Sequence, residues 1–111
     1  MRQAGVLAAA ALYALDHMVE RLAEDHANAR TLADELRHLG WSIDRTVVQT
    51  NIFFVEPPSD VDATGVTERL EARGVRVSSP YNGRTMRLVT HYGIESCDID
   101  LALEAFSRLS R

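Results

Sequence analysis

The stretch that decides the fold runs from residue 81 to residue 90 and reads Tyr81-Asn82-Gly83-Arg84-Thr85-Met86-Arg87-Leu88-Val89-Thr90. The Asn-Gly pair tolerates the positive φ angles of a tight reversal, so residues 81–84 predict a turn. Residues 85–90 are expected to return as a strand that pairs with an earlier strand over residues 75–78. Alternation along the returning strand places Arg87 on the opposite face from Met86 and Leu88.

Two helices are predicted at the start of the chain. Residues 2–18 are Ala-rich and favour a helix whose apolar side chains are spread around the axis. Residues 22–39 favour an amphipathic helix, and Gly40 is a natural stop for it. The expected buried face of this second helix carries Leu22, His26, Ala29, Ala33, Leu36 and Leu39.

Strands and a short helix are predicted next. Aromatic and β-branched residues favour strands around residues 41–43 and over residues 47–55. Pro57 and Pro58 would end the second of these strands. Asp60 or Asp62 can then cap a short helix that Gly74 closes. Its expected buried residues are Val66 and Leu70.

A last helix completes the pattern. Glu95 or Ser96 caps it. The residues expected on its buried face are Ile99, Ala102, Leu103 and Phe106. The order of elements predicts an α+β fold with a mainly antiparallel sheet of three to four strands packed with helices.

Composition narrows the classes of function. With 111 residues and 46% apolar content, the chain has enough residues for one core. A formal net charge of −4 argues against a nucleic-acid partner, because such partners select basic surfaces. The single Cys97 excludes an internal disulfide, and no signal peptide is evident. The cytoplasm is the expected compartment.

The first helix is expected to need a partner. The uncharged run from Ala4 to Leu15 is shorter than the roughly 20 residues that span a bilayer, so no membrane helix is expected. Its apolar side chains require cover on several sides. The expected organisation is therefore a linking helix over residues 1–18 and a small domain over residues 19–111.

Arg87 is the strongest candidate for a functional residue. The sequence alone allows two interpretations of it. It is either an Arg on the solvent face of a sheet, as Arg usually is, or a fixed guanidinium that grips a carboxylate through two hydrogen bonds.

Several segments, in this order and spacing, resemble one enzyme family. They are Met1 to Gly5, Arg21 to Arg30, Gln49 to Asn51, Arg73 to Val75, Arg87 to His91, and Asp98 to Asp100. Together they resemble the C-terminal domain of low-specificity L-threonine aldolases, pyridoxal 5′-phosphate enzymes of fold type I in the aspartate aminotransferase-like superfamily.

The resemblance implies a reaction and a division of labour. Enzymes of this family cleave threonine or allo-threonine, which are 3-hydroxy amino acids, to glycine and acetaldehyde in a retro-aldol step, and they form homotetramers. Arg87 matches the Arg that binds the substrate's α-carboxylate. Arg2 matches an Arg near the cofactor, although the glycines that precede it in the family are missing here.

The chain lacks the amine that holds the cofactor in that family. All 12 basic residues are Arg, so this chain cannot form the Schiff base, and no residue in it is expected to be catalytic. We therefore expect this chain to be a fragment that is inactive alone. The resemblance implies that a missing large domain supplies the Lys, the cofactor-stacking His and the pyridinium-pairing Asp. The alternative is a stand-alone, non-catalytic α+β module that binds a small acid or self-associates.

The histidines, Cys97 and Asn51 are not expected to take part in catalysis. The four histidines and Cys97 form no metal-ligand pattern, so no metal site is expected. His26 is expected to be a packed, hydrogen-bonded core residue, whereas His91 is expected in the wall of the Arg87 site. Asn51 is expected to fix the backbone locally through its side-chain amide.

Overall fold

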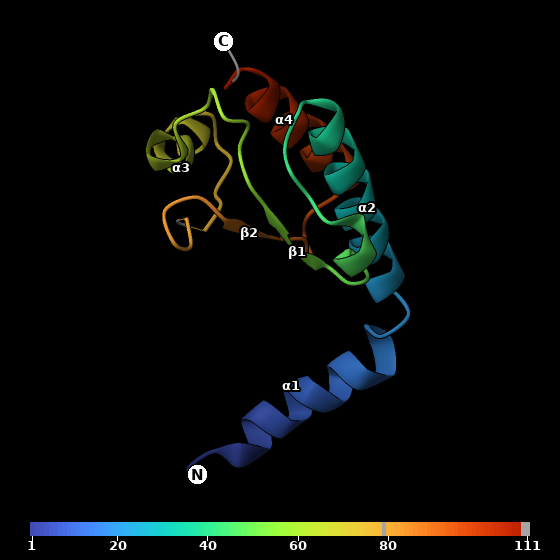
Figure 1. The fold of residues 1–111 in the computed structure, drawn as a ribbon. Coiled ribbons are helices and arrows are strands. Elements are labelled where there is room, and N and C mark those ends of the chain that lie inside the picture. The colour runs from blue at the N-terminus through green and yellow to red at the C-terminus, as the bar shows by residue number, and fades with distance from the viewer. Residues whose placement is uncertain (79, 110–111) are drawn as a thin grey trace.

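The computed structural model describes residues 1–78 and 80–109. It contains four helices and two strands in these residues, together with one short 3₁₀ turn at Arg45–Val47 (Figure 1). The bounds are α1 Ala4–His17, α2 Leu22–His38, β1 Ile52–Val55, α3 Ala63–Glu71, β2 Met86–Val89 and α4 Ser96–Ser107. The α+β class is confirmed, but the sheet has two strands in the described residues where three to four were predicted.

The strand β2 has a different partner from the one predicted. It pairs in antiparallel fashion with β1, with Phe54 opposite Arg87. Residues 75–78 run beside the other edge of β2 without forming a strand. At this edge the Ser78 hydroxyl, in place of a backbone group of a neighbouring strand, bonds to the backbone of Arg87. That hydroxyl donates to the Arg87 carbonyl over 2.7 Å and accepts from the Arg87 amide over 3.2 Å. The turn predicted at residues 81–84 is confirmed, because φ is +43° at Asn82 and +82° at Gly83.

The strand predicted over residues 47–55 begins only at Ile52. Before it, the Asp44 carboxylate accepts hydrogen bonds from the hydroxyl and the amide of Thr46, and these bonds lower the pKa of Asp44. This local bonding favours the turn at 45–47 over an extended chain. Residues 41–43 contribute a single bridge, between Ser42 and Glu56, where a strand was predicted.

The core lies between one face of the sheet and the helices α2 and α4, which pack against each other. Trp41 and Phe106 meet edge to face within it, with ring centroids 5.0 Å apart. The buried face of α2 differs from the prediction at its start, because Leu22 is exposed and His26 is half-buried without a hydrogen bond in the described structure. The residues that α2 buries are Asp25, Asn28, Ala29, Leu32, Ala33 and Leu36.

The N-terminal caps predicted for the third and fourth helices are both confirmed. The Asp62 carboxylate accepts the Thr64 amide at the start of α3, which lowers the pKa of Asp62. At the start of α4, Glu95 and Asp98 form a reciprocal capping box. Because these bonds join residues two or three positions apart, they can be read from sequence.

The helix α1 projects away from the rest of the chain (Figure 1) and buries none of its residues. The radius of gyration is therefore 16.1 Å, against about 13 Å for a compact domain of this length. Val6, Leu7 and Leu12 on this helix are all more than half exposed. None of the helices in the described residues is long and apolar enough to cross a membrane.

Candidate functional site

The face of the sheet turned away from α2 and α4 is open. Phe53, Val55, Met86 and Leu88 point into the core, so the alternating positions point outward. Arg87 stands on this outer face with three apolar neighbours that are 42–48% exposed. These neighbours are Ile52, Phe54 and Val89. The sheet therefore presents one guanidinium on an apolar surface.

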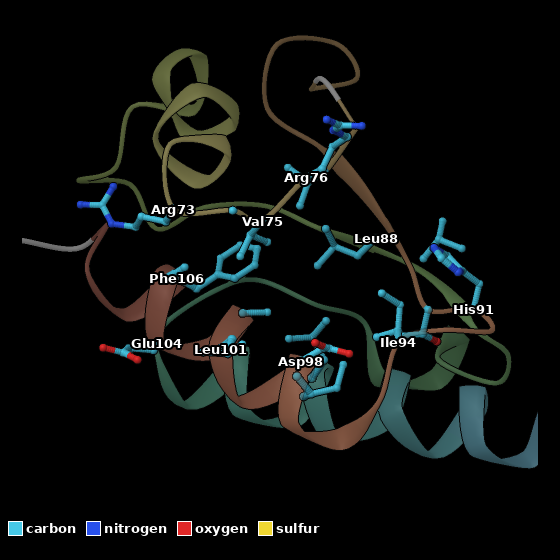
Figure 2. Close-up of a pocket in the computed structure, with 18 of the residues that line it drawn as sticks. Arg73, Val75, Arg76, Leu88, His91, Ile94, Asp98, Leu101, Glu104 and Phe106 are labelled. Carbon is cyan, nitrogen blue, oxygen red and sulfur yellow. The ribbon is translucent and has the colours of Figure 1, made fainter.

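A groove of about 750 Å³ runs along the edge of β2 that does not pair with β1, between residues 73–78 and α4 (Figure 2). Val75, Leu88 and Phe106 contribute apolar surface to it. Arg87 and His91 both belong to its wall, so the structure brings together the two residues that the sequence assigned to one site. The volume falls within the roughly 300–1,000 Å³ of small-molecule sites.

The arginines around the groove differ in what they already bind. The Arg73 guanidinium donates to the Arg69 carbonyl, Arg76 lies 3.8 Å from Glu71, and Arg108 pairs with Glu104. Within the part of the chain that the structure describes, the Arg87 guanidinium has no ion pair or hydrogen bond. It is therefore the groove arginine whose paired N–H groups are free to bind a planar anion.

The turn after β2 carries His91, which is exposed. Its Nδ1 lies 2.8 Å from the Tyr92 carbonyl, so it donates there in the Nδ1–H tautomer. The Ile94 amide closes the turn on the His91 carbonyl, and Gly93 adopts a φ of +92° that disfavours any residue with a Cβ. His91 is thus held beside the groove by its local backbone.

Other residues selected from the sequence lie elsewhere. Arg2 is exposed and precedes α1, the helix that projects away from the rest of the chain (Figure 1). Cys97 is exposed in the first turn of α4. Asn51 has a structural role, but not the local one expected, because its side-chain amide donates over 2.6 Å to the carbonyl of Thr90, 39 residues away. Across residues 1–78 and 80–109, His, Cys, Asp and Glu side chains form no group of three or more that could hold a metal ion.

Sequence reasoning missed a set of polar contacts beneath this site. Arg21 and Asp25 form an ion pair, and Thr90 and Asn28 bond to backbone groups more than 60 residues away in the chain. The spacing of four residues between Arg21 and Asp25 on a helix is a signal that could have found the first of these. The long-range bonds have no such signal.

The fold and the matched sequence place the chain in a class. A solved Sphingomonas wittichii serine palmitoyltransferase has the same fold over 86% of this chain and 25% of its own, with a TM-score of 0.71 and 20% identity. Residues 1–58 match the beta-eliminating lyase family, and the chain belongs to that family.

Within that class, the chain is homologous to low-specificity L-threonine aldolases over most of its length. It is 40% identical over 94 residues to the low specificity L-threonine aldolase of Escherichia coli (strain K12), which covers 85% of the chain and 26% of that protein. It is 38% identical over 112 residues to a probable low-specificity L-threonine aldolase 2 of Arabidopsis thaliana, covering 98% of the chain and 31% of the relative. The chain thus spans about a quarter to a third of the relatives it matches.

Proposed function

We propose that this chain is the C-terminal part of an L-threonine or L-allo-threonine aldolase and that Arg87 binds the substrate's α-carboxylate. The observation that carries the proposal is the free guanidinium of Arg87 on an open, apolar sheet face beside the groove. The identity of 38–40% to threonine aldolases supports the choice of substrate.

The surroundings of Arg87 suit this role. A guanidinium offers two parallel N–H groups, which match the two oxygens of a carboxylate and fix its plane. Phe54 and Val89 make the surface beside Arg87 apolar. Once a partner domain covers this face, the lower local polarity would strengthen a charged hydrogen bond. A carboxylate held in one plane also holds the attached Cα, and this orients the Cα–Cβ bond that the retro-aldol step breaks.

The chain does not supply a covalent site for pyridoxal 5′-phosphate. It contains no Lys, so no side-chain amine is available to condense with the aldehyde. We therefore assign the amine and the cofactor pocket to a large domain that this chain contacts. Arg2, exposed at the start of α1, is proposed to lie near that cofactor in the assembly, at a subunit boundary.

A chimera tests the proposed function. This chain replaces the matching 26% of the Escherichia coli enzyme, whose remainder provides the large domain. We expect the chimera to release acetaldehyde from threonine at a rate well above the truncated enzyme without this chain. A folded chimera with no more activity than the truncated enzyme would contradict the proposal.

The absence of Lys also keeps a second candidate function in view, that of a non-catalytic module that binds a small acid. Comparing the activity of the chimera with ligand binding by the isolated chain distinguishes the two functions. An inactive chimera, together with a chain that binds threonine or another small carboxylate at Arg87 on its own, would favour the module.

The exposed helix α1 predicts self-association of the isolated chain. Contiguous apolar surface beyond a few hundred Å² is unusual on monomers and marks interfaces. Replacing Leu7 and Leu12 with Glu should reduce the mass measured by light scattering and leave the circular dichroism of the remainder intact. Ala23→Glu with Thr31→Glu, both exposed on α2, adds equal charge as the control. A compact monomer that binds no hydrophobic dye would show that α1 needs no partner.

A further inference from the structure

The end of β2 is fixed by bonds to every polar group of Thr90. Its amide donates to the Asn51 carbonyl over 2.9 Å, and its carbonyl accepts the Asn51 side-chain amide over 2.6 Å. Its hydroxyl donates to the Asp25 carbonyl of α2 over 2.6 Å. Thr90 is only 2% exposed, so water does not compete for these bonds. Three residues beyond Arg87, the chain is therefore tied both to Asn51, the residue before β1, and to α2.

The far end of the following turn is tied to the same helix. The Asn28 side-chain amide donates to the Ile94 carbonyl over 3.0 Å, and Asn28 is buried. Because Asp25 and Asn28 are three residues apart, both contacts come from one face of α2. Residues 91–94 are thus held at both ends by α2.

An ion pair stabilises the α2 turn that makes these contacts. Two Arg21 nitrogens lie 2.9 Å and 3.1 Å from the two Asp25 carboxylate oxygens, and this bonding raises the pKa of Arg21. The same guanidinium lies 4.9 Å from the ring centroid of Tyr92, a cation–π distance. Arg21 therefore compensates a buried carboxylate and also contacts the middle of the turn.

From this geometry we propose that Thr90 and Asn28, supported by the pair Arg21–Asp25, are positioning residues for Arg87 and His91. They hold the end of β2 and its turn against α2, so that the Arg87 guanidinium stands in one place beside the groove. The consequence for substrate rests on the proposed function. Displacing a binding group by about 1 Å can cost up to a hundredfold in rate.

The isolated chain offers a direct test by NMR. Thr90→Val removes the hydroxyl with little change of shape, and Thr90→Ser restores it. We expect Val to speed amide exchange over residues 89–94 at least about tenfold and to raise the mobility of the Arg87 Nε–H group, and Ser to reverse both. Thr31→Val, on the exposed side of α2, is the matched control. Unchanged exchange and unchanged Arg87 mobility in Thr90→Val would overturn the proposal.

Asn28→Ala provides a second variant in case Thr90→Val does not fold. It removes one donor from the turn and leaves the strand's own bonds in place, so the same amides and the same Arg87 signal are measured. Exchange at 91–94 that stays at the wild-type rate in this variant would count against the proposal just as firmly.

A double-mutant cycle in the chimera separates positioning from general stability. We expect Thr90→Val to raise KM for threonine by about tenfold with a smaller change in kcat, and to add little in an Arg87→Ala background. Equal effects in both backgrounds would mean that Thr90 acts independently of Arg87. If Arg87→Ala itself has no effect, the proposed function fails, and the positioning of Arg87 is judged by the NMR result alone.

Discussion

The purified chain, supplied with pyridoxal 5′-phosphate and threonine, is expected to release no acetaldehyde above a control with cofactor alone. The reason is chemical: the chain has 12 Arg and no Lys, and a guanidinium does not form the required Schiff base. The measurement is a coupled assay for acetaldehyde over a range of chain concentrations. The active chimera serves as the positive control.

Clear turnover that scales with the concentration of the chain would contradict this expectation. It would mean that the Arg87 groove carries catalytic chemistry of its own and that the assignment of the amine to a separate large domain is wrong. Removing contaminating host aldolase is essential, so Arg87→Ala is purified and assayed in parallel. Equal activity in both preparations would identify a contaminant.

Replacing Arg87 with Ala in the chimera is expected to lower kcat/KM for threonine by about ten- to a hundredfold. A charge-assisted hydrogen bond to a ligand contributes about 1.5–3 kcal/mol, and that loss corresponds to this range of rates. Steady-state kinetics measure it. Arg87→Lys should recover only part of the loss, because an ammonium is a point charge without the paired N–H groups.

Arg30→Ala is the matched control, since Arg30 is exposed on α2 and lies outside the groove. It removes the same charge and the same length of side chain, so it should leave kcat/KM within about twofold, as expected for a remote surface change. If Arg87→Ala behaves like Arg30→Ala, the side chain is simply an Arg on the solvent face of a sheet.

Much of the helical structure follows from local signals. The Asp62 cap, the Glu95–Asp98 capping box and the positive φ of Gly40 and Gly74 all depend on residues within one helical turn. The outward position of Arg87 follows from the alternation of a strand, whichever strand it pairs with. These features were predictable for that reason.

The pairing of β2 was not predictable from the same signals. The Asn82-Gly83 reversal favoured residues 75–78 as its partner, but β1 occupies one edge of β2 and the Ser78 hydroxyl occupies the backbone groups of Arg87 on the other. Choosing between the two partners requires the relative energies of contacts some 35 residues apart. A propensity of single residues contains no such information.

The buried polar residues next to the site show most clearly which features the sequence determined and which only the tertiary structure decided. By itself, the sequence determined the helices, their caps, the apolar exposed α1, the missing Lys and the face on which Arg87 stands. The tertiary structure alone decided that Asp25, Asn28 and Thr90 are buried together and that Arg87 and His91 share a groove. The physical reason is that burying a polar group is tolerated only where a partner accepts it. For these residues, that partner comes from a distant part of the chain.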